Sequence, residues 1–318
     1  RVQKLLNLPK VTTAECIKKL ESLGLKTLKK SSEKALFEIP SWRHDLLREV
    51  DLIEEVGRLI GFDTIPSEIP RMCIAPNHEN PFVAFQDDCK FTFAAMGFSE
   101  VITYPFSSTT NYSHLLCQED SQLWPHVKLQ NALNEQEPYM QTSLIPSLLK
   151  ATAQNRNYGH KSSHFFEVGR GYYDLNQLDS SLHKTFIEDM KQNKNHLESN
   201  SEKFLVERTY LSGLIDSPQK ENCWREKETA PNFYDVKTLI EKFFYYINLH
   251  SITWEVPDEK ERPFLHPKAS AKILHKGTTL GYIGELHPRA AKNYELGADI
   301  PVVFELDLER CLASSENK

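Results

Sequence analysis

Three prolines within eleven residues constrain the fold of this chain more than any other sequence feature. Pro66, Pro70 and Pro76 fall in one short stretch. Proline cannot continue a helix and stiffens an extended chain, so this pattern is typical of a linker. We therefore predict a boundary near residue 75, with a small domain over residues 1–75 and a larger one over residues 76–318. At 318 residues the chain is long enough for each domain to bury its own core.

Composition narrows the class of protein. Hydrophobic residues make up 40% and charged residues 26% of the chain, which is typical of a globular protein. The net charge of −6 argues against non-specific nucleic-acid binding as the main task, although a local basic patch stays open. No apolar stretch approaches the roughly 20 residues of a membrane span, so we expect no membrane partner.

The cysteines indicate the compartment. They are scattered and form no CxxC pair, so we expect them to be reduced, mostly buried and cytoplasmic. A zinc site would need ligands from distant segments, and we do not expect one. The six cysteines are Cys16, Cys73, Cys89, Cys117, Cys223 and Cys311.

The small domain reads as a helix, a hairpin and a second helix, an order that resembles winged-helix proteins. Thr12 and Glu15 have the spacing of a capping box, and the helix that they begin should end at Gly24. Residues 25–40 then predict two short strands with a basic turn. Lysines on a hairpin edge more often block aggregation than bind nucleic acid, so we favour a solvated edge. The lysines concerned are Lys26, Lys29, Lys30 and Lys34.

Four carboxylates at the start of the second helix form the strongest chemical signal. Asp51 lies one helical turn from both Glu54 and Glu55, and Asp45 precedes them in a turn. Hard oxygen donors at this density suit magnesium. However, acidic residues at a helix start also interact favourably with the helix dipole. The spacing alone therefore leaves open whether these residues bind a metal or only stabilise the helix.

The larger domain predicts a mixed α+β fold without the regular alternation of a parallel sheet. An aromatic-rich helix should run from Phe82 to Met96, and a hairpin should turn at Lys276-Gly277. The polar segment Asn176–Lys203 reads as a surface insertion. Further helices are expected over residues 145–156, 235–248 and 288–294, and strands over residues 100–106, 127–130, 163–173, 208–215, 251–254, 270–275, 279–286 and 302–308.

Other motifs are weaker evidence for a chemical function. His266-Pro267 and His287-Pro288 could be a metal pair, but each is better read as a turn before a new element. The chain contains no GxxxxGK[ST], GxGxxG or GxSxG motif. We therefore predict no catalytic residue.

Several motifs, taken in order, resemble the beta subunit of bacterial phenylalanyl-tRNA synthetase. The clearest is Pro-Ser-Trp-Arg-His-Asp at residues 40–45, followed by Asp-Leu-Ile-Glu-Glu-Val at residues 51–56. The others cover nearly the whole chain, at residues 61–66, 96–104, 142–149, 155–156, 166–170, 265–267, 281–288 and 304–308.

The resemblance implies more than the spacing does. It implies a magnesium ion held by Asp45, Asp51, Glu54 and Glu55 and shared with a catalytic alpha subunit in an (αβ)2 heterotetramer. It also implies that the second domain is a class II synthetase-like antiparallel sheet flanked by helices, without catalytic residues. The assembly would bind tRNA and attach phenylalanine to it using ATP.

The sequence departs from the family pattern in places. Gln141 stands where an arginine is often found, and no GxGxER-like motif with its phosphate-clamping arginine is evident. We also expect the editing, tRNA-binding and anticodon-contacting regions of a full beta subunit to lie outside this chain. The alternatives are an active class II ligase and a stand-alone nucleic-acid-binding module on residues 1–70.

Overall fold

The computed structural model describes residues 1–32, 34–67, 69, 80–160, 163–176, 205–216, 231–297 and 300–315. The chain divides into two compact units, Arg1–Asn77 and His78–Lys318. The predicted insertion lies outside the described residues except for Asn176, as do the linker residues Pro70 and Pro76. Within the described ranges, no helix is both long enough and apolar enough to cross a membrane.

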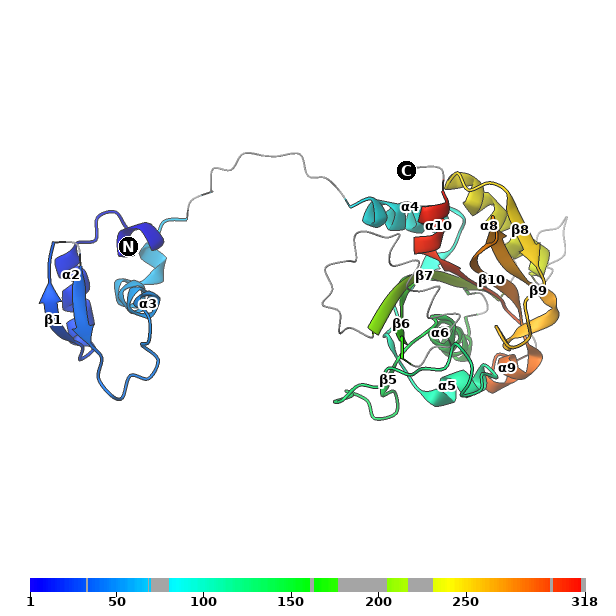
Figure 1. Ribbon diagram of the computed structural model, residues 1–318, viewed down its shortest axis with the longest axis horizontal. Coiled ribbons are helices and arrows are strands. Elements are labelled where there is room, and N and C mark those ends of the chain that lie inside the picture. Colours follow the sequence, from blue (N-terminus) through cyan, green and yellow to red (C-terminus); the bar gives the residue numbers. More distant parts are fainter. Residues whose placement is uncertain are drawn as a thin grey trace. The chain divides into compact units, whose positions relative to one another are not determined.

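The first unit packs helices around a two-stranded antiparallel sheet (Figure 1). The predicted capping box is present, because Thr12 and Glu15 each accept a hydrogen bond from the other's backbone N–H. Gly24 follows that helix with a φ of 84°, a conformation that favours glycine. The elements are α1 (Val2–Leu5), α2 (Thr13–Ser22), β1 (Lys26–Lys30), β2 (Ala35–Glu38), α3 (Glu49–Ile60) and the 3-10 turn η1 (Phe62–Thr64).

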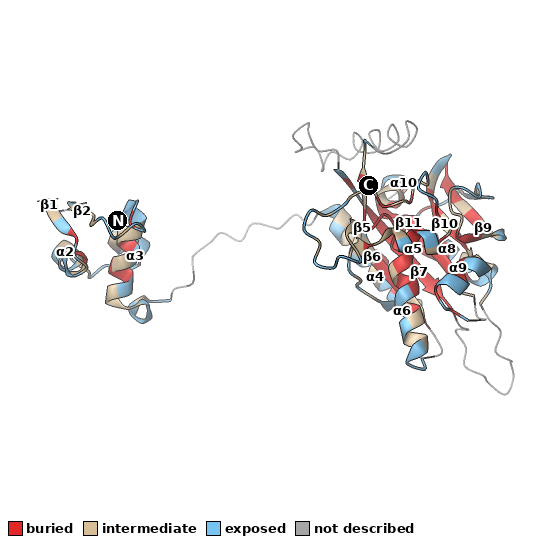
Figure 2. Ribbon diagram, turned by 90° about the horizontal axis from the view of Figure 1, so that it is seen from below, coloured by how far each residue is buried: buried red, intermediate tan, exposed pale blue. Residues whose placement is uncertain are grey.

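The second unit is built on a seven-stranded sheet with the order β3-β6-β7-β11-β10-β9-β8. All neighbouring strands are antiparallel except β3 and β6. β11 is buried along its whole length, which makes it the centre of the fold (Figure 2). The strands of this sheet are β3 (Ser99–Glu100), β6 (His164–Asp174), β7 (Leu205–Ile215), β8 (Ile252–Glu255), β9 (Leu265–His275), β10 (Thr278–Leu286) and β11 (Val302–Asp307).

Helices cover both faces of this sheet (Figure 1). One face packs against α4 (Pro81–Ala95), α8 (Phe233–Tyr246) and α10 (Leu308–Ser314). The other packs against α5 (Thr109–His114), α6 (Ile145–Asn157) and α9 (Pro288–Asn293). Side chains of β11 alternate between the two cores, Phe304 and Leu306 entering one and Val303 the other. A separate small pair joins β4 (Phe106–Ser107) to β5 (Tyr139–Met140).

Most predicted elements of the second unit are confirmed, including the mixed α+β class with a mainly antiparallel sheet. The predicted hairpin joins β9 to β10, and both of its turn residues, Lys276 and Gly277, have positive φ values of 49° and 84°. Two consecutive positive φ values match the right-handed twist of the flanking strands. The helices α5 and α10 were not predicted.

Two predicted strands are wrong. Of residues 100–106 only Glu100 and Phe106 belong to strands, because Thr103 donates its backbone N–H and its hydroxyl to the side-chain carboxylate of Glu167 on β6 instead of to a backbone carbonyl. Residues 127–130 form a single bridge, from Lys128 to Tyr139. The opposing segment contains Pro138, which has no N–H to continue the ladder.

Candidate functional site

Two of the four predicted metal ligands meet at one arginine. The Arg43 guanidinium donates to the Asp45 carboxylate at 2.6 Å and 2.9 Å and lies 3.0 Å from Glu55 Oε1. Arg58 donates to the other Glu55 oxygen at 2.6 Å. The hydrogen bonds from Arg43 lower the pKa of Asp45 to about 2, and those from Arg58 and then Arg43 lower the pKa of Glu55.

The other two carboxylates are placed differently. Asp51 Oδ2 accepts hydrogen bonds from the backbone N–H groups of Leu47 at 2.9 Å and Arg48 at 2.6 Å. Its carboxylate therefore pairs with backbone groups at the N-terminal end of α3. These two bonds lower the pKa of Asp51. Glu54 is exposed and makes no hydrogen bond or ion pair with another described residue.

The carboxylates therefore offer suitable donors without forming a ready-made cage. Their oxygen chemistry fits magnesium. Among the residues that the structure describes, however, no three acidic, histidine or cysteine side chains are grouped as metal ligands. The pKa values of Asp45, Asp51 and Glu55 are all lowered. At these three carboxylates nearby guanidinium and N–H groups supply positive charge that outweighs their mutual repulsion.

The second unit holds a buried polar centre on its central strand. Glu305 is 5% exposed, and its Oε2 accepts hydrogen bonds from Ser143 Oγ at 2.8 Å, Leu144 N at 3.1 Å and Ser212 Oγ at 2.8 Å. The carboxylate of β11 thereby ties the start of α6 to β7. Its place in the sequence carries no signal of this role.

A degenerate GxGxER-like pattern is present at residues 305–310, although none was expected from the sequence. Glu309 and Arg310 form the end of a GxGxER-like pattern, in which Glu305 and Asp307 stand at the two glycine positions. An arginine is therefore present, but it lies 3.5 Å from the Asp307 carboxylate and donates to Thr279 O at 3.1 Å. The Asp307 carboxylate beside it makes the place unsuitable for a triphosphate, because like charges repel.

The two His-Pro motifs make local hydrogen bonds. His287 caps α9, since its Nδ1 accepts from Arg289 N at 3.1 Å, and His266 Nδ1 accepts from Lys268 N at 3.2 Å. The reading of these motifs as turns is supported at His287, whereas His266 lies within β9.

The aromatic side chains of α4 and α8 lie mostly in the core. Phe93 is fully buried, with its ring centroid 5.0 Å from that of Phe243 and 5.4 Å from that of Phe304. Most of this aromatic surface is therefore used to fill the core on one face of the sheet. Exposed exceptions are Phe91, Tyr234, Tyr245 and Tyr246.

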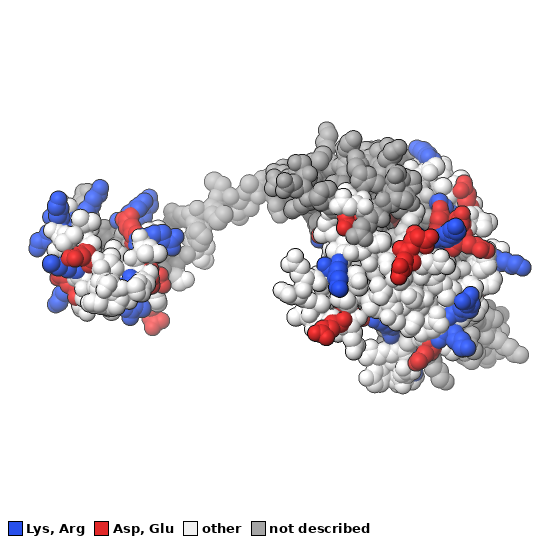
Figure 3. All heavy atoms as spheres, turned by 60° about the horizontal axis from the view of Figure 1, so that its bottom comes forward, with Lys and Arg blue, Asp and Glu red and all other residues white. Residues whose placement is uncertain are grey.

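Charge on the first unit is mixed. Figure 3 shows basic and acidic side chains interleaved on the face in view. On β1 three lysines are exposed, and only Lys26 has a described acidic partner, Glu38 at 3.6 Å.

Known proteins match both units. Residues 1–62 match the tRNA synthetase B5 domain, and residues 65–308 match the phenylalanyl tRNA synthetase beta chain CLM domain. The phenylalanine–tRNA ligase beta subunit of Carboxydothermus hydrogenoformans is 32% identical over 94% of this chain, and that of Syntrophotalea carbinolica 29% identical over 93%. In both cases the match covers 34% of the relative, so the chain spans about a third of the length of these relatives.

The fold agrees with these matches. The crystal structure of pyrrolysyl-tRNA synthetase from Desulfitobacterium hafniense aligns with 95% of this chain and 88% of its own, with a TM-score of 0.50 and 14% identity. A flanked, mainly antiparallel sheet of this kind defines a protein with the class II aminoacyl-tRNA synthetase-like fold. Within that class, the CLM match over residues 65–308 decides the family. The chain belongs to the phenylalanyl-tRNA synthetase beta chains.

Proposed function

We propose that this chain is a non-catalytic part of a phenylalanine–tRNA ligase beta subunit that scaffolds the catalytic alpha subunit. The proposal rests on one observation above others: a tRNA synthetase B5 domain match is followed along the chain by a match to the phenylalanyl tRNA synthetase beta chain CLM domain. We assign residues 1–75 to the small acidic-motif domain and residues 76–318 to the synthetase-like core. The assembled enzyme would bind tRNA and attach phenylalanine to it using ATP, in the cytoplasm.

The absence of catalysis in the isolated chain is the first testable part. Arg170 pairs with Glu207 at 2.6 Å, and Arg310 is held by Asp307 and Thr279, so neither is free to clamp phosphates. ATP–pyrophosphate exchange should be absent from the purified chain and should appear only when an alpha subunit is added. Exchange by the chain alone that is lost in Arg310→Gln or Arg170→Gln would refute this part and favour an active class II ligase.

The second part concerns Mg²⁺, which we propose is held by Asp45, Asp51, Glu54 and Glu55 and shared with the alpha subunit. When bound, the ion would supply positive charge that orders the turn before α3 and its contact, not a reacting group. The approach of Asp45 and Glu55 to one guanidinium supports the idea that their carboxylates can reach a common point.

Three substitutions separate metal binding from helix stability. Glu54→Gln removes a carboxylate that has no other described partner, and Asp51→Asn keeps an oxygen for the N–H groups of Leu47 and Arg48. Both should weaken Mg²⁺ binding to the assembled enzyme, measured by calorimetry, without unfolding the domain. The matched control is Glu49→Gln, in the same helix but paired with Arg1. Unchanged Mg²⁺ binding in Glu54→Gln and Asp51→Asn would leave these residues as a helix-start charge cluster only.

The third part concerns assembly into an (αβ)2 heterotetramer. The exposed aromatic side chains Phe91, Tyr245 and Tyr246 lie on α4 and α8, which contact each other on one face of the sheet. Exposed aromatic residues of this kind are enriched at protein interfaces. Co-purification with an alpha subunit should be weakened by Phe91→Ser combined with Tyr245→Ser. Formation of a full-strength heterotetramer by this variant would exclude that surface.

A second candidate function rests on β1. Its exposed lysines, and a helix–hairpin–helix order like that of winged-helix proteins, would supply a nucleic-acid contact by residues 1–70 if the hairpin edge is more than a solvated surface. This reading predicts RNA affinity without any alpha subunit, falling steeply with salt because phosphate contacts release counterions. Lys29→Glu with Lys30→Glu should abolish that affinity, and a chain without salt-dependent RNA binding would eliminate the candidate.

A further inference from the structure

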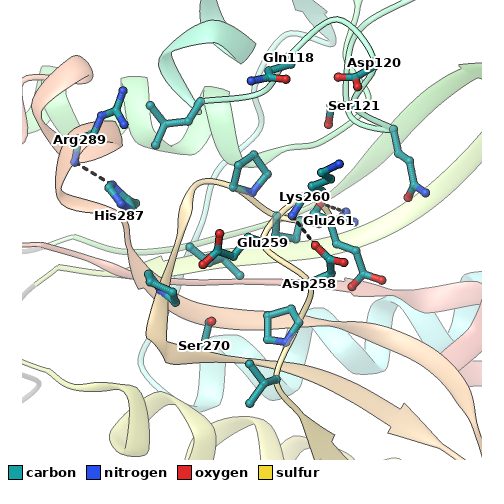
Figure 4. A pocket seen from close by; sticks show the side chains of 18 residues that line it. Gln118, Asp120, Ser121, Asp258, Glu259, Lys260, Glu261, Ser270, His287 and Arg289 are labelled. Carbon is teal, nitrogen blue, oxygen red and sulfur yellow. Dashed lines mark hydrogen bonds between the residues drawn. The ribbon is translucent and has the colours of Figure 1, made fainter.

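A pocket opens in the second unit between two loops and the start of α9 (Figure 4). Its walls come from residues 116–122, residues 256–263, strand β9 and the residues that begin α9. The volume is about 780 Å³. Sites for small molecules usually fall between about 300 and 1,000 Å³, so the pocket can hold one. Neither the proposed magnesium site nor the buried Glu305 centre is part of it.

The charges of the pocket are unevenly distributed. In Figure 4, Arg289 and His287 lie at one side of the pocket, whereas Asp120, Asp258 and Glu261 lie at the other with Lys260 among them, and Glu259 lies between the two sides. A ligand that spans the pocket therefore meets hydrogen-bond donors at one end and carboxylates at the other.

The basic side of the pocket offers hydrogen-bond donors that no described residue uses. Because His287 Nδ1 accepts from Arg289 N, a neutral ring carries its proton on Nε2, where it can donate. Partial burial and the charges of Arg289 and His266 lower the pKa of His287, which favours that neutral ring. The Arg289 side chain is exposed and makes no hydrogen bond or ion pair within the described part of the chain.

A second arginine reaches the pocket wall. Arg262 stacks on the Tyr282 ring, with its guanidinium carbon 4.1 Å from the ring centroid. Its Nη1 donates to the Glu261 carbonyl at 2.7 Å. Its Nε is buried without a hydrogen-bond partner, which is unusual for so polar an atom.

Of the four carboxylates that line the pocket, two are already engaged. Glu261 accepts from Lys272 at 2.8 Å and from the Tyr282 hydroxyl at 3.2 Å, and Asp258 accepts from Lys260 N at 2.9 Å. Asp120 is exposed and makes no hydrogen bond with any residue in the described ranges. Glu259 is likewise exposed and makes no hydrogen bond within the described ranges, but Asp120 is the unpaired carboxylate on the side of the pocket away from Arg289 (Figure 4).

We propose that this pocket binds a small zwitterion, with its anionic group at Arg289 and His287 and its ammonium group at Asp120. The anion can be a carboxylate or a phosphate, since both accept from the same donors. A ligand with one charge would satisfy only one side of the pocket. The proposal does not depend on the role of the chain in a ligase.

Three probes of equal carbon-chain length test the separation of charge. Aminocaproate carries both charges, caproate only the anion and hexylamine only the cation. Titrated into the 318-residue chain and followed by NMR, aminocaproate should bind at least about tenfold more tightly than either of the others, the value of one charge-assisted contact. Equal binding of caproate and aminocaproate, or no saturable binding of aminocaproate, would overturn the proposal.

Two single substitutions test which residue binds each charged end of the ligand. Arg289→Gln and Asp120→Asn should each weaken aminocaproate binding about tenfold or more. Both side chains are exposed, so the fold should be unaffected, as circular dichroism can check. The control Arg170→Gln, outside the pocket, should bind as the parent does. Loss of affinity in the control to the same extent would refute the assigned ends.

A last pair of probes identifies the anion. Phosphoethanolamine and γ-aminobutyrate place a phosphate and a carboxylate at the same number of linking atoms from an ammonium group. Tighter binding of either one supports the proposal and names the anion. Binding of neither, under conditions in which inorganic phosphate alone binds, would reduce the pocket to a simple anion site.

Discussion

Replacement of Glu305 by alanine should destabilise the second unit by about 3–5 kcal/mol. The carboxylate is nearly buried, and one of its oxygens accepts hydrogen bonds from Ser143, Leu144 and Ser212. Alanine leaves all three donors without this acceptor inside the protein. The start of α6 would lose its side-chain hydrogen bonds to β11, and Ser212 of β7 would lose one, while β7 stays paired with β11 through the backbone.

The magnitude follows from these contacts. A hydrogen bond to a charged group contributes about 1.5–3 kcal/mol, so three of them amount to about 4.5–9 kcal/mol. The variant no longer buries a carboxylate, and the desolvation that it avoids offsets several kcal/mol. Glu305→Gln is the matched control, because its amide oxygen can accept the same hydrogen bonds. Neutral acceptors are roughly half as strong, so Glu305→Gln should cost only about 1–2 kcal/mol.

Urea unfolding measures the difference. A Trp42→Phe background leaves only tryptophans of the second unit, so their fluorescence reports on that unit alone. The midpoint should fall most in Glu305→Ala while the slope of the transition stays constant. A loss below about 1 kcal/mol in Glu305→Ala would refute the reasoning. An equal loss in both variants would show that charge, not hydrogen bonding, is what matters.

Three further predictions address other parts of the chain. Phe93→Ala should lower the free energy of unfolding by about 3–5 kcal/mol because its ring fills an aromatic cluster, whereas the exposed Phe91→Ala should stay within about 0.5 kcal/mol in the same urea experiment. Arg43 lowers the folded pKa of Asp45 to about 2, so the stability from this pair should be present above the unfolded pKa of about 3.9 and be lost as pH falls toward 2. An NMR titration in which Arg43→Gln leaves the Asp45 pKa unchanged would contradict that cause. Gly277→Ala should lower the thermal midpoint, with a loss of about 1 kcal/mol, because alanine is strained at a φ of 84°, and an unchanged midpoint would exclude such strain.

Local signals in the sequence predicted local structure well. The capping box at Thr12 and Glu15 and the turn at Lys276-Gly277 depend on residues at most a few positions apart, whose conformations need no distant partner. The failed strand at residues 100–106 shows the limit. The backbone N–H of Thr103 donates a hydrogen bond to the Glu167 carboxylate, and the two residues are 64 positions apart in sequence. Propensity cannot anticipate a competing acceptor at that distance.

The candidate metal site was likewise predictable from the sequence in part only. The residue types and spacing of Asp45, Asp51, Glu54 and Glu55 are enough to suggest a hard cation. Which of their oxygens are free is a question of folded geometry, because Arg43 and Arg58 occupy Glu55 while backbone N–H groups occupy Asp51.

By itself the sequence determined the helix ends, the tight turns, the family and the chemistry of the acidic set. Only the tertiary structure decided what Glu305 does, since Ser143 lies 162 positions away in the chain. The same holds for the pocket, whose walls are brought together from residues 116–122, 256–263 and the start of α9. Helix caps and turns form from neighbouring residues at small entropic cost, whereas a buried hydrogen bond or a pocket exists only after distant segments have packed.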